Sequence, residues 1–336
     1  MPPLADLFSR DSGISLNAHR RWLQYPIEGT INTLFHGALS ALPSTVVSAF
    51  GHCCADLGRW RYRNRVFAQR IARNYETLIP DPKAVEDSHE RGLRRWWHNI
   101  GRTMAEFSKA NHLWREGNIR LCGEDNLATA KACGGPLIFV SMHLGTWEAA
   151  FTAIHEGLAG PSIGPFQPEP NPFTNKIVYR LRKKRKQYLF PPGQRSAIRL
   201  HKLMCSGDTS MTIFIDEVRD DQIHLPAFGR PLPTRGNAVV AIKLANVCGG
   251  TLVPFYLKRT NGPQFDLNIL PPLRLAEDND KAYPLRGTLA DLNDIFEPLV
   301  VQNLEHWYML GELRLPAGFE ADRDMRDRLL SLRSHS

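Results

Sequence analysis

Short apolar runs, separated by helical patterns, dominate the second half of the chain. Pro136–Met142 follows a Cys-Gly-Gly turn, and Met211–Ile215, Thr251–Leu257 and Phe265–Leu270 are runs of the same kind. Such runs between turn residues are typical of strands buried on both faces. Between the second and third runs, Gly236–Val247 has helical apolar spacing and precedes two glycines, which favour a helix stop. Alternating strands and helices predict an α/β layer with a largely parallel sheet.

Residues 1–120 instead show the apolar spacing of helices. One stripe runs from Asp81 to Ala110, with Asp81 as the expected N-cap and Pro82 at the first helical position. Leu285–Asn303 is also expected to be helical, with a kink or division at Pro298.

These patterns predict three regions. Residues 1–120 form a helical, membrane-associated region, 121–316 form the α/β core, and 317–336 form a charged tail that is a peripheral helix or a frayed end.

No apolar run is long enough to span a bilayer comfortably. Ile31–Cys54 comes nearest, but polar residues and Pro43 interrupt it. A spanning helix needs about 20 mostly apolar residues. Two interpretations stay open for this segment: it lies in the membrane interface, or it is a helical hairpin broken at Pro43 and packed on the domain. The first residues lack the basic-then-apolar pattern of a secretory signal.

Composition and charge narrow the choice of partners. Hydrophobic residues make up 43% of the chain, which excludes wholesale disorder. The net charge of +8 favours anionic partners such as nucleic acid, phospholipid headgroups or an acidic carrier protein. The densest basic run, Arg180–Lys186, is either a solvated helix face or a site that binds lipid phosphates, the anionic membrane surface or an acidic carrier protein. Arg235 at a helix start is a weaker phosphate candidate. Nucleic acid is disfavoured because no aromatic platform or reader motif accompanies these charges.

The six cysteines contain no C-x-x-C pair and no zinc-finger spacing. We therefore expect reduced cysteines in a cytosolic environment.

The sharpest chemical feature is His143-Leu-Gly-Thr-Trp-Glu148, directly after the Pro136–Met142 run. Catalytic groups in open α/β sheets gather at the carboxyl ends of strands. If Gly145 lets the chain turn, Glu148 on the first helical turn could orient the His143 imidazole, whose other nitrogen would act as a general base. The alternative is a histidine that only caps the strand or helix. Metal catalysis is disfavoured, because H-x4-E lacks the spacing of two ligands on one helix face.

The same segment resembles the H-x-G-x-W-E signature of the late acyltransferases of lipid A biosynthesis, a branch of the H-x4-D/E glycerolipid-type acyltransferases. Other matching segments keep the family's order along the chain. They are Arg70–Pro80, Asn171-Pro172 with Arg180 and Arg182, Asp216, Pro226–Pro231, Glu297 and Glu305.

The resemblance implies a glycerolipid-acyltransferase-like mixed sheet flanked by helices, with an N-terminal helical region apposed to a membrane. It implies that His143 and Glu148 are catalytic, and that Asn171, Arg180, Arg182 and Asp216 contact substrate. Backbone N–H groups near Gly145, or an arginine, would stabilise the oxyanion.

The implied reaction is O-acyl transfer to a hydroxyl of a lipid A precursor at the cytoplasmic face of the inner membrane. The donor would be an acyl carrier protein thioester, or acyl-CoA, and no metal or other cofactor is implied. Two alternatives stay open: the same chemistry on a phospholipid, glycolipid or secondary metabolite, and a non-catalytic lipid-binding protein on the same scaffold.

Overall fold

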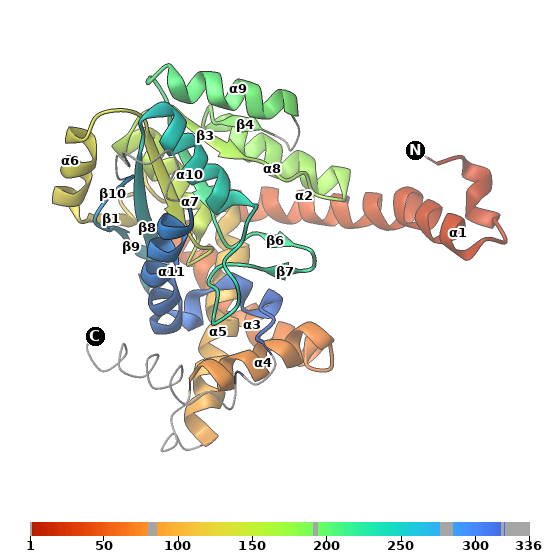
Figure 1. Cartoon of the computed structure of the whole chain (residues 1–336). Helices are drawn as coiled ribbons and strands as arrows, with labels where there is room; N and C mark the ends of the chain where they lie inside the picture. The colour runs from red at the N-terminus through yellow and green to blue at the C-terminus, as the bar shows by residue number, and fades with distance from the viewer. Residues whose placement is uncertain (1, 80–85, 191–193, 276–284, 317–318, 320–336) are drawn as a thin grey trace.

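The computed structural model describes residues 2–79, 86–190, 194–275, 285–316 and 319. An eight-stranded sheet forms its centre, in the order β1-β9-β8-β2-β5-β3-β4, with β10 beside β8 (Figure 1). In this described part, neighbouring strands run parallel except at β8–β9 and β8–β10. The strands are β1 Ile119–Cys122, β2 Leu137–Ser141, β3 Ser162–Pro165, β4 Tyr188–Phe190, β5 Ser210–Phe214, β8 Thr251–Asn261, β9 Gln264–Ile269 and β10 Leu273–Arg274, with a separate hairpin of β6 Val218–Arg219 and β7 Gln222–Ile223.

Helices surround this sheet and also form an N-terminal extension. The α-helices are α1 Ser12–His19, α2 Tyr25–Ala41, α3 Ser44–Tyr62, α4 Val66–Leu78, α5 Glu86–Glu106, α6 Glu124–Ala132, α7 Trp147–Ala153, α8 Pro172–Lys184, α9 Gln194–Cys205, α10 Asn237–Cys248 and α11 Leu285–Gln302. Short 3₁₀ or π turns are η1 Leu4–Phe8, η2 Arg20–Gln24, η3 Phe107–Lys109, η4 Ile154–Leu158, η5 Leu304–His306 and η6 Tyr308–Glu312.

Strand β2 shows why the sheet is covered on both faces. Leu137 and Phe139 point into a core shared with α6 and α7, whereas Ile138 and Val140 point into the core shared with α10 and α11. A strand with two buried faces needs an uninterrupted apolar run, which is the pattern in its sequence. The predicted α/β class, with a mostly parallel sheet flanked by helices, is confirmed.

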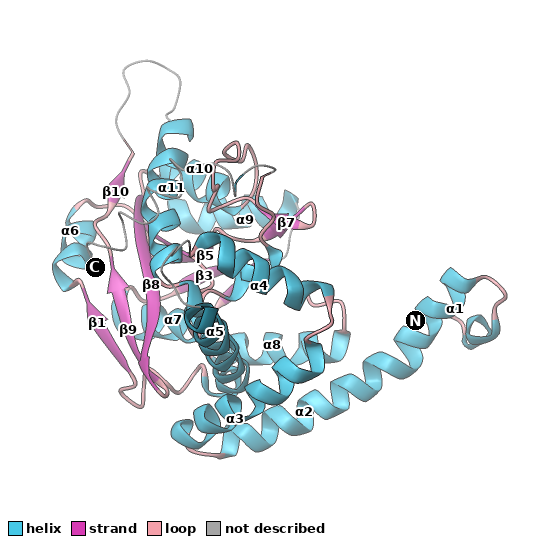
Figure 2. Ribbon diagram, turned by 90° about the horizontal axis from the view of Figure 1, so that it is seen from below, coloured by secondary structure: helices cyan, strands magenta, loops and turns pink. Residues whose placement is uncertain are grey.

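The segment around Pro43 forms a helical hairpin. Helix α2 ends at Ala41 and α3 begins at Ser44, so the chain reverses at Leu42 and Pro43. Helix α2 projects away from the sheet, with α1 at its far end (Figures 1 and 2). Among the described helices, none is long and apolar enough to cross a bilayer.

Two expectations concern residues outside the described ranges. The N-cap at Asp81 and the proline at Pro82 lie there, and so does the 317–336 tail apart from Phe319. Pro298 lies within α11, which continues past it as one helix, so the predicted division at this proline does not occur.

The expectation of six reduced cysteines is wrong for one pair. Cys205 and Cys248 are joined by a disulfide, with their Cα atoms 4.9 Å apart. They end helices α9 and α10, which pack together, and their sequence separation of 43 leaves no spacing motif in the sequence. The other four cysteines are free.

Helices α3 and α5 cross at two glycines. A Cβ atom on Gly51 would lie 2.4 Å from the carbonyl oxygen of Gly101, and a Cβ on Gly101 would lie 2.4 Å from that of Gly51. Real Cβ atoms do not approach backbone oxygens this closely, so the crossing depends on the missing side chains.

We expect Gly51→Ala to lower the free energy of unfolding by about 2 kcal/mol, because the added methyl group must push α5 away. Gly58→Ala is the matched control, since a Cβ there meets nothing within 4 Å on the same helix. Alanine's helix propensity should make the control more stable by about 0.5–1 kcal/mol. Thermal and urea unfolding measure both, and equal effects of the two variants would contradict the proposed contact.

Candidate active site

His143 and Asp216 meet at the carboxyl edge of the sheet. Strands β2 and β5 are parallel neighbours in which the last residues, Ser141 and Phe214, pair with each other. His143 and Asp216 each lie two positions beyond the end of their strand. Their side chains contact directly, with His143 Nδ1 2.7 Å from Asp216 Oδ1. The structure therefore brings these two predicted site residues together.

Three donors orient the Asp216 carboxylate, which is fully buried. The imidazole lies at Oδ1, while the backbone N–H of His143 donates to Oδ2 at 2.8 Å and the Trp307 indole N–H donates to Oδ2 at 2.9 Å. A carboxylate at Nδ1 favours the tautomer that has its proton on Nδ1. The second nitrogen, Nε2, is then the one that can accept a proton.

The His143 ring lies among aromatic side chains but stays accessible. It stacks on Phe214 at 4.6 Å between ring centroids and contacts Trp147 edge-on at 5.1 Å. The side chain remains 21% exposed, and within the described residues Nε2 makes no hydrogen bond. A substrate hydroxyl can therefore reach Nε2 without displacing a protein partner.

The turn after His143 is fixed by the C-terminal segment. Gly145 has a φ of +58°, and its N–H donates to the carbonyl of His306 at 3.1 Å. The Tyr308 N–H donates to the carbonyl of His143 at 2.9 Å. Gly145 thus makes the turn, as predicted, but its own N–H is engaged and cannot serve as the oxyanion donor.

A buried ion pair between Arg259 and Glu106 also supports the turn at Gly145. Arg259 donates to both carboxylate oxygens of Glu106 at 2.6 and 2.7 Å, and Thr146 donates to Glu106 at 2.5 Å. Thr103 reaches the carbonyl of Gly145 at 3.3 Å. These contacts hold Gly145 and Thr146 between α5 and β8.

The expected pairing of Glu148 with His143 is wrong in this structure. Arg182 holds Oε1 of Glu148, and Arg185 donates to Oε2 at 2.7 Å. Two guanidiniums form charge-assisted bonds that a neutral imidazole cannot match. Glu148 instead joins α7 to α8, and Asp216 takes the orienting position.

Charge and burial act in opposite directions on Glu148. Burial alone would raise the pKa of this carboxyl, but Arg182 and Arg185 lower the pKa to about 2. The carboxylate is therefore ionised, and it neutralises Arg185, which has no exposed side-chain surface.

The remaining predicted substrate contacts do not gather around His143. Asn171 caps α8 by accepting from the Phe173 N–H at 3.0 Å, and its amide donates to the carbonyl of Tyr25. Arg180 is exposed on α8, and Arg235 forms an exposed ion pair with Asp220 at 2.8 Å. Within the described residues, neither arginine contacts His143 or Asp216.

Sequence reasoning missed two residues that build the site, Trp307 and Arg185. Trp307 is fully buried and is itself fixed by the Trp96 indole N–H, which donates to its carbonyl at 2.8 Å. Arg185 was hidden in a run of six basic residues, where inward and outward positions look alike.

We expect Glu148→Gln to lower the free energy of unfolding by about 3 kcal/mol at pH 7, because Arg185 would be left buried without its counter-charge. Because the folded-state pKa lies below the ordinary 4.5, the ionic contribution is present above that value and is lost as the pH falls toward about 2. Denaturant unfolding at a series of pH values measures this contribution to the free energy of unfolding. Arg180→Gln on the exposed face of α8 is the control, with a change within about 0.5 kcal/mol. A stable Glu148→Gln protein would contradict the anchoring role.

The chain is similar to known acyltransferases in sequence and in structure. A profile of the bacterial lipid A biosynthesis acyltransferase family matches residues 17–314. No curated protein sequence matches the chain. Among solved structures, the 1-acyl-sn-glycerophosphate (LPA) acyltransferase PlsC from Thermotoga maritima is similar over 76% of this chain and 95% of that chain, with 12% sequence identity and a TM-score of 0.36. Because the profile spans most of the sequence and the site agrees with its chemistry, this chain belongs to the bacterial lipid A biosynthesis acyltransferase family and is an acyltransferase acting on a lipid.

Proposed function

We propose that the enzyme moves a fatty acyl group from an acyl carrier protein thioester to a hydroxyl of a lipid A precursor, with His143 as general base. The observation that carries this proposal is the 2.7 Å contact between His143 Nδ1 and buried Asp216, which leaves Nε2 without a hydrogen-bond partner among the described residues. A base with an orienting carboxylate can activate a hydroxyl without a nucleophile from the protein.

The reaction follows from this arrangement. Nε2 removes the proton of the acceptor hydroxyl as its oxygen attacks the thioester carbonyl. Asp216 stabilises the imidazolium that forms. When the tetrahedral intermediate collapses, the carbon–sulfur bond breaks and the imidazolium returns the proton to the departing thiolate. The products are an ester and a free carrier thiol.

A basic stripe on α8 supports an acidic carrier or an anionic lipid as partner. The basic run divides into two faces: Arg182 and Arg185 turn inward to Glu148, whereas the exposed side carries Lys176, Arg180, Lys183 and Lys184. These four are spaced by four, three and one residues, so they lie within one side of the helix. An uncompensated positive stripe attracts phosphate groups and acidic proteins.

Helix α2 supports attachment to the cytoplasmic surface of the inner membrane. Ile27, Ile31 and Leu34 are between 58% and 69% exposed and recur every three or four residues on one face of α2, and exposed Leu23 lies in the preceding turn η2. Helix α2 also packs beside α8, where Gly29 meets Phe173. An apolar stripe on a projecting helix fits the interface of a bilayer, where its side chains leave water.

We expect wild-type enzyme with acyl carrier protein thioesters of several lengths and a tetra-acylated lipid A precursor to give a product heavier by one acyl chain. His143→Ala should give none, and Asp216→Asn should lower kcat by about a thousandfold or more, because the imidazole loses its orientation and counter-charge. Asp220→Asn, the same charge change at an exposed position, should keep its activity. Product mass and thermal unfolding are measured on every variant.

The possible outcomes separate the parts of the proposal. Thioester loss that depends on His143, without acylated precursor, would keep the base and discard the acceptor. Transfer from acyl-CoA in preference to the carrier thioester would discard the donor. Folded Asp216→Asn enzyme with normal turnover would remove Asp216 as the orienting residue. Lipid binding without consumption of any thioester would favour a non-catalytic lipid-binding protein.

We expect Leu34→Glu to weaken binding to vesicles of anionic phospholipid by about tenfold or more, since a buried leucine contributes about 1.5–3 kcal/mol. Ser40→Glu adds the same charge to the other side of α2 and should change binding far less. Vesicle co-sedimentation at fixed salt measures both. Equal losses for the two variants would show that charge alone, rather than the apolar stripe, governs binding.

A further inference from the structure

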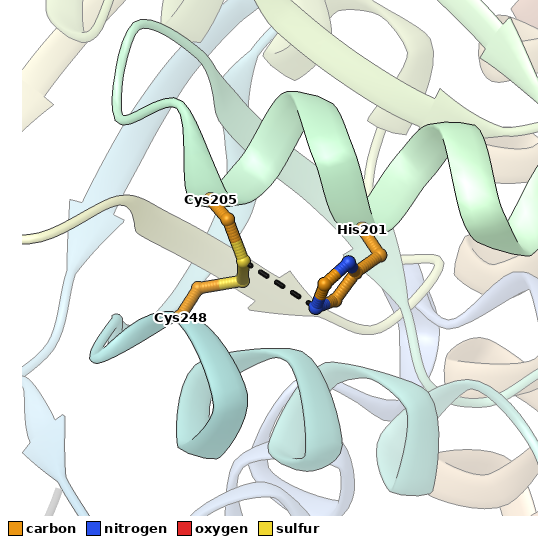
Figure 3. Close-up of side chains that lie close together, drawn as sticks. All are labelled: His201, Cys205 and Cys248. Atoms are coloured by element: carbon orange, nitrogen blue, oxygen red, sulfur yellow. Dashed lines mark hydrogen bonds between the residues drawn. A yellow bond between two sulfur atoms is a disulfide. The ribbon is translucent and has the colours of Figure 1, made fainter.

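A second cluster of chemically active side chains lies outside the catalytic site. His201 and Cys205 are four residues apart on α9, so they share one helix face, and Cys248 ends the neighbouring helix α10. The imidazole Nε2 of His201 lies 3.5 Å from the Cys205 sulfur, and one ligand atom from each of the three residues lies within 4.8 Å of the others (Figure 3). The catalytic contacts described above use none of these residues.

We propose that His201 and the reduced pair Cys205 and Cys248 bind a thiophilic divalent cation such as Zn²⁺, and that the disulfide is the oxidised, metal-free state of this site. Two sulfurs and one imidazole are a ligand set that suits Zn²⁺. Tetrahedral bonds of about 2.3 Å to sulfur and 2.0 Å to nitrogen place ligand atoms roughly 3.5–3.8 Å apart. The His201–Cys205 spacing already has this value.

The surroundings of the cluster favour a cation independently of the ligand types. Helices α9 and α10 both terminate at the cluster, with Cys205 and Cys248 as their last residues. Helix C-termini carry partial negative charge, which attracts cations. His201 and Cys205 are exposed, so water can complete the fourth position of a tetrahedral site.

Electrons and protons balance when the disulfide form is converted to the metal-bound form. A dithiol reductant supplies two electrons and two protons, which break the sulfur–sulfur bond and leave two thiols. Binding of the divalent cation then releases both thiol protons and forms two metal–thiolate bonds. A disulfide oxidant reverses the exchange: it accepts two electrons from the thiolates and takes up two protons to become a dithiol, while the two sulfurs rejoin and the cation leaves.

The test uses the full chain, reduced with dithiothreitol, freed of reductant under nitrogen and titrated with Co²⁺ as a spectroscopic probe for Zn²⁺. We expect one equivalent to give the visible absorption of a tetrahedral thiolate site, and Zn²⁺ to remove it. The signal should be absent from oxidised wild type and from reduced Cys248→Ser. Cys133→Ser, a free cysteine elsewhere, is the matched control and should behave as wild type.

His201→Gln tests the third ligand. Its affinity for Co²⁺ should fall by about tenfold or more, because one metal–nitrogen bond is lost. Thermal unfolding confirms that each variant is folded. If the reduced wild type showed no thiolate absorption, Cys205 and Cys248 would form a disulfide and no metal site. An unchanged signal in Cys248→Ser would assign binding to other cysteines, and unchanged affinity in His201→Gln would remove the imidazole, so either result overturns the site.

Discussion

The parallel pairing of β2 with β5 is the constraint from which the catalytic geometry follows. With Ser141 beside Phe214, the next residues leave the sheet together, and the structure places His143 against Asp216. A shift of one strand by a single residue would turn its side chains to the opposite face. Both strands are buried along their whole length, so a shifted register would have to repack the two close-packed cores on either side of the sheet.

Much of the remaining architecture holds the loop that leaves β2. Arg259 and Glu106 fix it from the side of α5, and His306 and Tyr308 bond to it from the C-terminal segment. Glu148 on α7 pairs with Arg185, which directly follows α8, so this ion pair joins the two helices. His143 therefore follows a strand whose exit is held on several sides, while its side chain stays partly exposed.

The long strands were predictable from sequence because each is a continuous apolar run. β3 and β4 were not predicted: Ser162–Pro165 contains a glycine and a proline, and Tyr188–Phe190 is only three residues long. The position of His143 was predictable from its place after a strand. Its partner was not, because a carboxylate five residues away and one 73 residues away look equally suitable until the register is known. The same distance in sequence concealed the pairing of Cys205 with Cys248.

Trp307 has a consequence for the order in which the enzyme becomes active. Its indole donates to Asp216 from a segment that follows α11, near the end of the described chain. A nascent chain that has emerged only as far as α11 holds both His143 and Asp216 but lacks this donor and the backbone bonds from His306 and Tyr308. The site would thus be completed late in synthesis, only after the segment that follows α11 has been made.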